Sequence, residues 1–190
     1  MKFLFPLLGY LSCSIPFGFI IAKIKGKDIR NFGSGNIGAT NLFRFDKKLG
    51  IVTGILDILK SFIPTFLALK FSDFFIASIT ALLGILGHAF TPFLRFKGGK
   101  SVSCTFGAYI VLSPLQFLIS FIFFFILLFL TKTASISSIF SIFLLLVLIF
   151  IFNFPLYFKI ITFFIFLLIL FLHRENIKRI IKGEERKLKF

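Results

Sequence analysis

Residues 101 to 130 read SVSCTFGAYIVLSPLQFLISFIFFFILLFL, an apolar stretch that is long for one membrane-spanning helix and is interrupted by Ser113-Pro114. A helix needs about 20 apolar residues to cross roughly 30 Å of hydrocarbon. Proline has no backbone N–H and disfavours helix in the residue before it, so a break at this dipeptide is chemically reasonable. The stretch therefore predicts two helices, of which the first, residues 101–113, is about 20 Å long and short for a span.

The rest of the chain is similarly apolar. Its 190 residues include 33 Phe and have a mean hydropathy of +1.04, which is too apolar for an ordinary soluble domain of this size. Other stretches that qualify or nearly qualify as spans are residues 3–22, 49–69, 74–93, 136–152 and 154–172. The sequence thus predicts an all-α integral membrane protein with about seven transmembrane helices and a single membrane-embedded domain over residues 1–190.

The distribution of basic residues predicts the orientation. The formal charge is +15, from 22 basic and 7 acidic residues. Seven crossings put the basic segments 23–48, 94–100, 131–135 and 173–190 on one side, which the positive-inside bias makes cytoplasmic. We therefore expect the N-terminus outside and the C-terminus in the cytoplasm. No nucleic-acid partner is expected, because no basic soluble module with interleaved aromatic residues is present.

The first polar segment between spans is NFGSGNIGATNLFR, residues 31–44, which is small, polar and rich in glycine. Its glycines allow backbone N–H groups to approach a ligand closely. Ser34, Asn36, Thr40 and Asn41 add short hydrogen-bonding side chains, and Arg44 adds a forked cation suited to phosphate. Such a segment can form a concave nest of N–H groups for an anion. A flexible basic loop is the alternative interpretation.

A second polar segment is GHAFTPFLRFKGGKSVS, residues 87–103. Gly98-Gly99 breaks helical structure and places Lys100 at the N-terminus of the next helix, where N–H groups, the helix dipole and an ammonium favour phosphate. His88 by itself is equally consistent with a packed histidine at a helix end.

A third polar segment, HRENIKRIIKGEERK, occupies residues 173–187. Helical spacing puts His173 and Asn176 on one face, and Gly183 suggests the end of the helix. The alternative interpretation is a basic helix that binds anionic lipid at the membrane surface.

Two other pairs of residues lie in or beside the spans. Asp57 and Lys60 are three residues apart and can form an ion pair across one helical turn, as a structural element or as the wall of a site. Cys13 and Cys104 are far apart in sequence and have neither a disulfide framework nor metal-ligand spacing. We expect no metal and no cofactor.

The predicted topology brings the three polar segments to the same face of the membrane. Groups that suit phosphate then lie beside apolar helices that suit an acyl chain. This combination indicates an enzyme that acts on an anionic head group and a lipid tail.

The three segments, in this order, resemble the signature motifs of the PlsY-type acyl-phosphate:glycerol-3-phosphate acyltransferases of bacteria. The matching residues are GSGNIGATNLFR, FKGGK after GHxF, and HxxNxxRxxxGxExK, and the similarity covers essentially the whole chain. The resemblance implies a multi-pass enzyme of the bacterial cytoplasmic membrane whose active site faces the cytoplasm. It would transfer a fatty acyl group from acyl phosphate to the 1-hydroxyl of glycerol 3-phosphate, giving lysophosphatidic acid and phosphate in the first step of phospholipid synthesis. A PlsX-type phosphate acyltransferase would supply the donor.

The resemblance also implies the site residues. Catalytic roles would fall to Ser34, His173 and Asn176. The substrate-binding residues would be Asn36, Thr40, Arg44, Lys100, Ser138 and Glu184, with Ser135 as a competing match for Ser138. The family usually has Gly-Val-Ala-Thr after Lys100, and this chain departs from that pattern at Ser101, Ser103 and Cys104.

The mechanism expected from these residues lacks a His-Asp general base. An HxxxxD pattern is absent, because Phe93 stands five residues after His88 and Lys178 five after His173. Acyl phosphate is a mixed anhydride with a good leaving group, so direct attack by the bound hydroxyl is expected, with His173 or a substrate phosphate taking the proton.

Two other functions use the same residues. An anion transporter or binding protein for phosphate or phosphorylated polyols would place the same cations at the same face, but should also have a polar path to the outside. A structural anchor with basic loops would explain the charge and leave the Gly-Asn-Ser segment unexplained.

Overall fold

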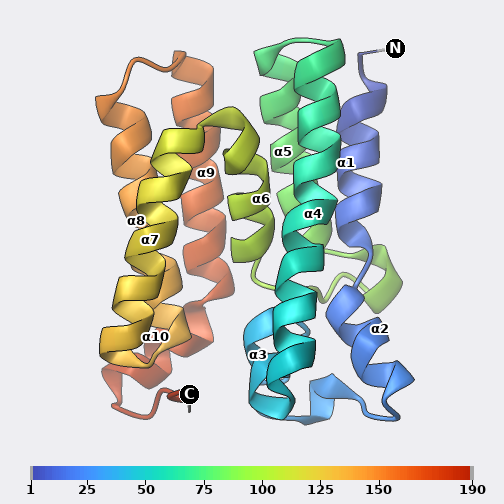
Figure 1. Ribbon diagram of the computed structural model, residues 1–190, viewed down its shortest axis with the longest axis vertical. Coiled ribbons are helices and arrows are strands. Elements are labelled where there is room, and N and C mark those ends of the chain that lie inside the picture. The colour runs from blue at the N-terminus through green and yellow to red at the C-terminus, as the bar shows by residue number, and fades with distance from the viewer. Residues whose placement is uncertain (1, 189–190) are drawn as a thin grey trace. The chain divides into compact units, whose positions relative to one another are not determined.

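The computed structural model describes residues 2–188, and every regular element in that range is a helix. The chain divides into two compact units, Met1–Leu112 and Ser113–Phe190, which are described separately below (Figure 1). The expectation of a single domain over residues 1–190 stays a prediction.

The first unit is built around one long helix, α4. Its elements are α1 (Leu4–Ser14), α2 (Phe17–Ile24), η1 (Ile29–Asn31), α3 (Ala39–Phe45), α4 (Lys47–Phe71), α5 (Phe74–Ala89), η2 (Pro92–Leu94) and α6 (Val102–Leu112). Helix α4 packs against α1, α5 and α6, and α1 also packs along α5 (Figure 1). Gly9 of α1 lies against Thr80 of α5, and Gly84 of α5 lies against Cys13 of α1. Small residues at these positions let the two backbones approach closely.

Two prolines in this unit release backbone carbonyls, and neighbouring helices supply the missing donors. Pro16 ends α1, since the residue before it, Ile15, is extended with ψ 117°. The Ile15 carbonyl accepts a hydrogen bond from Lys60 Nζ at 2.8 Å. Pro64 has no N–H for the carbonyl of Lys60, four residues earlier in α4. Ser12 Oγ and Cys13 Sγ donate to that carbonyl at 3.1 and 3.2 Å, so α1 and α4 satisfy each other's interrupted backbone.

The second unit contains α7 (Pro114–Thr131), α8 (Ala134–Ile151), α9 (Leu156–Leu172) and α10 (Arg174–Ile181). Helix α8 packs against both α7 and α9. Its buried residues Ile142, Leu145 and Ile149 recur at helical spacing, which gives α8 one apolar face towards its neighbours. The tail returns to the connection between α7 and α8, where the Leu188 N–H donates to the Lys132 carbonyl at 2.7 Å.

The helices account for the predicted spans. Within the described residues 2–188, five segments are long and apolar enough to cross a membrane, namely Leu4–Ile24, Lys47–Phe71, Phe74–Leu94, Pro114–Thr131 and Ala134–Ile151. Helices α9 and α10, bent by 59°, make a sixth if they are counted as one span, and α6 is shorter at 11 residues. The predicted break at Ser113-Pro114 is confirmed, and so is the all-helical membrane protein. Residues 3–22, expected as one helix, are interrupted at Ile15-Pro16.

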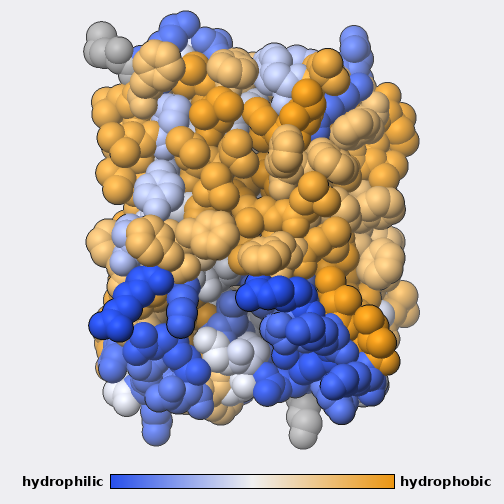
Figure 2. All heavy atoms as spheres, turned by 180° about the vertical axis from the view of Figure 1, so that it is seen from behind, coloured by the Kyte–Doolittle hydropathy of each residue, from blue (hydrophilic) through white to orange (hydrophobic). Residues whose placement is uncertain are grey.

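The surface is apolar along the helices. Large hydrophobic side chains are exposed on α1, α4, α7, α8 and α9. In each unit most of the hydrophilic side chains gather at one end, which carries α2 and α3 in the first unit and α10 in the second (Figure 2). A surface of this kind suits helices whose flanks contact lipid.

Candidate active site

The first polar segment is organised by Asn41, whose side chain is buried in α3 at 1% exposure. Its Oδ1 accepts a hydrogen bond from the Ser34 N–H at 2.9 Å, and its Nδ2 donates to the carbonyls of Ile29, Phe32 and Asn36 at 3.2, 2.9 and 2.9 Å. Gly33, with φ +57°, lies so close to this amide that any side chain there would overlap it. The segment is therefore a fixed turn built around one amide, which the sequence identified only as a possible donor to a ligand.

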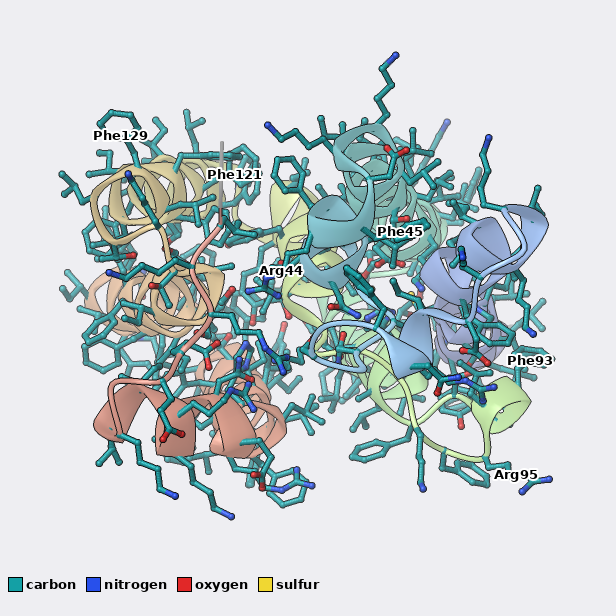
Figure 3. All side chains as sticks on the ribbon, turned by 90° about the horizontal axis from the view of Figure 1, so that it is seen from below. Arg44, Phe45, Phe93, Arg95, Phe121 and Phe129 are labelled. Carbon is teal, nitrogen blue, oxygen red and sulfur yellow. The ribbon has the colours of Figure 1, made fainter. Side chains whose placement is uncertain are left out.

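The site residues predicted in this segment sit on that turn and on α3. Ser34 and Asn36 are half-buried, and the Asn36 side chain accepts from the Gly38 N–H at 2.9 Å. Thr40 and Arg44 lie four residues apart on α3, so they share one face of the helix. Arg44 and Phe45 leave α3 in different directions (Figure 3). Phe45 packs edge-on against Phe32 at 5.6 Å between ring centroids, which ties the end of α3 to the turn.

The residues before the turn form an exposed ion pair. Asp28 accepts hydrogen bonds from Arg30 Nε at 2.9 Å and Nη2 at 2.6 Å. These bonds from Arg30 lower the pKa of Asp28 to about 2. The Arg30 guanidinium also lies over the Phe19 ring at 4.8 Å. Beside this pair is a cavity of about 380 Å³, lined by residues of the 26–32 segment and by Phe45.

The second polar segment is bonded to the end of α5. The Gly98 N–H donates to the Ala89 carbonyl at 2.9 Å, and the Gly99 N–H donates to the His88 carbonyl at 3.0 Å. Lys100 follows, half-buried, two residues before α6 begins at Val102. The predicted placement of Lys100 at the N-terminus of a short helix is confirmed.

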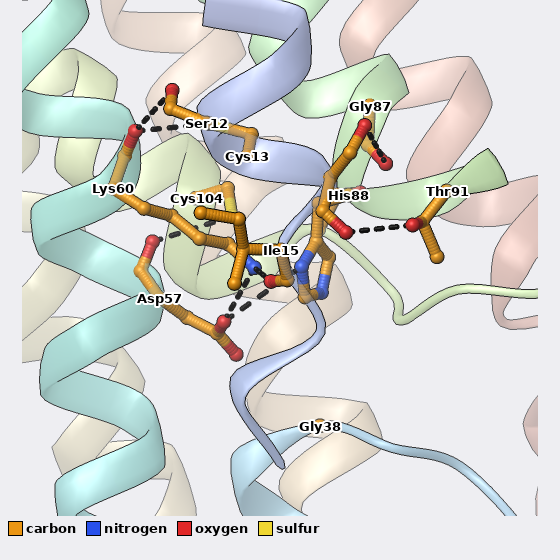
Figure 4. Close-up of polar contacts among 12 residues, drawn as sticks. Ser12, Cys13, Ile15, Gly38, Asp57, Lys60, Gly87, His88, Thr91 and Cys104 are labelled. Atoms are coloured by element: carbon orange, nitrogen blue, oxygen red, sulfur yellow. Dashed lines mark hydrogen bonds and ion pairs between the residues drawn. The ribbon is translucent and has the colours of Figure 1, made fainter. Parts of the chain in front are cut away.

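A buried polar cluster lies behind this segment (Figure 4). Lys60 Nζ is 2.8 Å from Asp57 Oδ1, so the ion pair predicted within α4 is confirmed, and His88 Nδ1 is 3.8 Å from the same oxygen. Cys104 Sγ donates to the Asp57 carbonyl at 3.3 Å. Ligand atoms of Asp57, His88 and Cys104 lie within 4.8 Å of one another, but the Lys60 ammonium already supplies the positive charge that the carboxylate needs.

The third polar segment begins at the bend between α9 and α10. His173 is buried at 2% exposure, and its Nδ1–H donates to the Ile169 carbonyl at 2.8 Å, because a carbonyl can only accept. Nδ1 therefore carries a proton, and in the neutral form of the imidazole this tautomer has its lone pair on Nε2. Helix α10 ends at Ile181, two residues before Gly183, as the sequence predicted.

Asn176 is held by Glu185, the residue after Glu184, which the sequence predicts to bind substrate. Asn176 Nδ2 donates to Glu185 Oε1 at 2.6 Å, Ser135 Oγ donates to the same oxygen at 3.0 Å, and Arg179 Nε donates to Oε2 at 2.8 Å. Glu184 is exposed. The glutamate of the GxE pattern stands two residues after Gly183, which is position 185. Glu185 therefore joins the candidate site, and substrate binding by Glu184 stays a prediction.

Ser135 and Ser138, the two competing matches, are both buried on α8, at 5% and 7% exposure. They are three residues apart and so share one face of the helix. Ser135 is occupied with Glu185, and the carbonyl of Ser138 accepts from Ser141 Oγ at 3.0 Å. Ser138 therefore stays the candidate for substrate binding, and Ser135 is part of the structure that holds Asn176.

Glu185 makes acid sensitivity a test of this arrangement. Burial raises the pKa of Glu185, but hydrogen bonds from Asn176, Arg179 and Ser135 outweigh it and hold the pKa below its ordinary value. A lowered pKa means that the carboxylate stabilises the fold above its unfolded pKa of about 4.3 and loses this effect as the pH falls through the folded value. We expect Glu185→Gln to lower the unfolding temperature near neutral pH, with a difference from the wild type that narrows in acid.

Thermal unfolding in detergent between about pH 3 and pH 7 measures this difference. Glu184→Gln is the matched control and should follow the wild type, since Glu184 is exposed. If the unfolding temperatures of the wild type and of Glu185→Gln differ by the same amount at every pH, the assigned role of Glu185 is wrong.

Comparison with known proteins identifies the chain. Residues 3–183 match the family model of glycerol-3-phosphate acyltransferase. The glycerol-3-phosphate acyltransferase of Ehrlichia canis (strain Jake) is 45% identical over 185 residues, covering 95% of both chains, and that of Aquifex aeolicus (strain VF5) is 39% identical over 191 residues, covering 98% of this chain and 100% of the relative.

A solved structure matches the fold as well. The crystal structure of PlsY, an integral membrane glycerol 3-phosphate acyltransferase, in its glycerol 3-phosphate form superimposes with a TM-score of 0.96 at 36% identity, covering 99% of this chain and 96% of PlsY. Its lysophosphatidic acid form gives 0.92 at 35% identity, covering 99% and 95%. The chain therefore belongs to the PlsY-type glycerol-3-phosphate acyltransferase family, and it is an integral membrane glycerol-3-phosphate acyltransferase of phospholipid synthesis.

Proposed function

We propose that the acyl donor is a fatty acyl phosphate and that the products are 1-acyl-sn-glycerol 3-phosphate and inorganic phosphate. The observation that carries the proposal is the setting of His173, whose Nδ1–H is held by the Ile169 carbonyl at 2.8 Å. A backbone carbonyl orients the imidazole with Nε2 as the acceptor but makes it a milder base than a carboxylate partner would. A mild base suits a donor with a good leaving group, because little proton abstraction is needed before attack.

In the proposed reaction, the 1-hydroxyl oxygen of glycerol 3-phosphate attacks the carbonyl carbon of the acyl phosphate. The new C–O ester bond forms as the C–O bond to phosphate breaks, and phosphate leaves with the bonding electrons. The hydroxyl proton goes to Nε2 of His173 or to a substrate phosphate oxygen. Asn176 and Ser34 stabilise the oxyanion of the tetrahedral intermediate by donating hydrogen bonds.

The remaining predicted residues bind the anionic substrates. Arg44 and Lys100 neutralise phosphate, Arg44 through its forked guanidinium. Asn36, Thr40 and Ser138 add hydrogen bonds from short side chains. Glu185 does not contact substrate in this proposal. It holds Asn176 in place through the 2.6 Å hydrogen bond.

We also propose that the N-terminus lies outside, that the C-terminus and the polar segments lie in the cytoplasm, and that the membrane is the bacterial cytoplasmic membrane. The clustering of hydrophilic side chains at one end of each unit supports this orientation (Figure 2). A PlsX-type phosphate acyltransferase would then deliver the acyl phosphate from the cytoplasm.

The donor is tested with purified protein in detergent and labelled glycerol 3-phosphate. Palmitoyl phosphate, palmitoyl-CoA and palmitoyl carrier protein are supplied in separate reactions. We expect labelled lysophosphatidic acid from palmitoyl phosphate alone, with one inorganic phosphate released per product. Product from palmitoyl-CoA or from the carrier protein would overturn the donor. Bound glycerol 3-phosphate without product from any donor would favour an anion-binding or transport protein.

The same reaction carried out with His173→Ala identifies the proton acceptor. If Nε2 takes the proton, kcat falls by about 100-fold or more, which is the usual contribution of a general base. Full kcat in this variant would assign the proton to a substrate phosphate. The wild-type protein incubated with palmitoyl phosphate should form no acyl-enzyme adduct at Ser34 on mass spectrometry, because the proposed attack is direct.

A further inference from the structure

The mechanism above uses Lys100 and leaves His88 without a role, although the two residues belong to one piece of structure. The Gly98 and Gly99 N–H groups bond to the last carbonyls of α5, those of Ala89 and His88, at 2.9 and 3.0 Å. Carbonyls at the end of a helix have no partner within the helix, so this pairing fixes the glycine segment to α5.

The imidazole of His88 lies directly against Gly99. A methyl group on Gly99 would stand 2.8 Å from Cε1 and 3.0 Å from Cδ2 of the ring, and it would overlap Nε2. The ring itself is buried at 5% exposure. Gly99 therefore rests on the Nε2 edge of a buried side chain.

The opposite edge of the ring faces the Asp57–Lys60 ion pair (Figure 4). Nδ1 of His88 is 3.8 Å from Asp57 Oδ1, and Lys60 Nζ is 2.8 Å from that oxygen. Lys60 also donates to the Ile15 carbonyl at 2.8 Å. The pair is thus anchored to α1 as well as α4, and it forms a fixed support behind the imidazole.

On its other side Lys100 is held by Ser101. Ser101 has a left-handed backbone, φ +63°, which is costly for a residue with a side chain, and its Oγ donates to the Ile85 carbonyl of α5 at 2.9 Å. Both neighbours of Lys100 are therefore tied to the last two turns of α5, Gly99 through His88 and Ser101 through Ile85.

We propose that His88 is a positioning residue for the glycerol 3-phosphate site: its imidazole, supported by the Asp57–Lys60 pair, carries Gly99 and so fixes where Lys100 presents its ammonium to the anionic substrate. This role deepens the proposed function and rests on it through Lys100. A cation whose backbone is held in advance binds phosphate at a lower ordering cost, because only its side chain remains to be ordered. The role of His88 therefore affects the affinity for glycerol 3-phosphate and not the proton transfer.

Substitutions at His88 distinguish the contribution of the Nε2 edge of the ring from that of the Nδ1 edge. Glutamine can place its amide nitrogen near the position of Nε2, whereas asparagine reaches only as far as Nδ1. We expect His88→Ala and His88→Asn to raise KM for glycerol 3-phosphate by about tenfold with kcat within about threefold of the wild type. His88→Gln should restore most of the affinity.

The decisive test is a pair of double variants. Gly99→Ala should lower kcat/KM by about 100-fold, because its methyl group displaces the segment against the ring. Adding His88→Ala removes the imidazole that the new methyl group strikes, so kcat/KM of the double variant should be about tenfold higher than that of Gly99→Ala. Gly98→Ala is the matched control. Its methyl group would strike the backbone carbonyls of His88 and Ala89, which remain when the imidazole is removed. Adding His88→Ala to Gly98→Ala should therefore leave kcat/KM unchanged.

Two further measurements distinguish a change in substrate binding from misfolding and from a wrong acyl donor. Size-exclusion chromatography and thermal unfolding in detergent confirm that each compared variant is folded. Equilibrium binding of labelled glycerol 3-phosphate reports the position of Lys100 without any acyl donor, so a wrong donor and a wrong role for His88 give different results. Unchanged KM and binding in His88→Ala, or equal recovery of the Gly98→Ala and Gly99→Ala variants, would overturn the proposal.

Discussion

Asn41→Leu is expected to lower kcat/KM for glycerol 3-phosphate by at least about 100-fold, although Asn41 does not contact substrate in the proposed mechanism. Leucine branches at the same atom as asparagine, but its methyl groups cannot form hydrogen bonds, so it leaves the Ser34 N–H and the carbonyls of Ile29, Phe32 and Asn36 without this partner. Each buried polar group left unsatisfied costs about 1–3 kcal/mol. The turn should therefore rearrange towards water, and Ser34 and Asn36 would move with it.

Kinetics with palmitoyl phosphate and binding of labelled glycerol 3-phosphate measure this effect. Asn31→Leu is the matched control, because Asn31 is an exposed asparagine of the same segment and should tolerate the change. Asn41→Asp adds a finer comparison, since a carboxylate still accepts from Ser34 N–H but cannot donate to the three carbonyls. Wild-type affinity in Asn41→Leu would show that the turn holds its shape without the amide.

Local chemistry explains which parts of the fold could be predicted. The break at Ser113-Pro114, the end of α10 before Gly183 and the Asp57–Lys60 pair each depend on neighbouring residues, and all three are present. The interruption at Ile15-Pro16 also has a local cause, but whether a span tolerates it depends on the Lys60 side chain 45 residues away. Hydropathy alone carries no information on that contact.

In the candidate site, too, features with a local cause could be predicted and features that depend on distant contacts could not. Sequence spacing placed Lys100 at the start of α6 and identified the polar segments, but it could not assign roles within them. Asn41 is one of three asparagines in the first segment, and only the fold shows that it faces four backbone groups of the turn. Glu184 and Glu185 are adjacent, and their roles differ because the tail folds back so that Glu185 faces α8 and α10.

Lys60→Met is expected to destabilise the protein by about 3–5 kcal/mol, since it leaves Asp57 buried at 2% exposure without its cation. The Ile15 carbonyl loses its hydrogen bond from Lys60 in the same variant and keeps only the one from the Phe17 N–H at 3.1 Å. For a chain of this length the unfolding temperature in detergent should fall by roughly 10 °C. Adding Asp57→Asn removes the buried charge, so the double variant should recover most of the loss.

The comparison with an exposed pair decides whether burial is the cause. Lys2 Nζ and Asp73 Oδ2 are also close, at 3.0 Å, but the two side chains are 65% and 44% exposed. Water and ions screen such a pair, and Lys2→Met should cost about 0–1 kcal/mol. If Lys60→Met and the double variant unfold at the same temperature, the cost would come from the lost bond to Ile15 and not from the uncompensated carboxylate. The Asp57–Lys60 pair would then act chiefly as a bridge between α4 and α1, and the support it gives to His88 would be mechanical and not electrostatic.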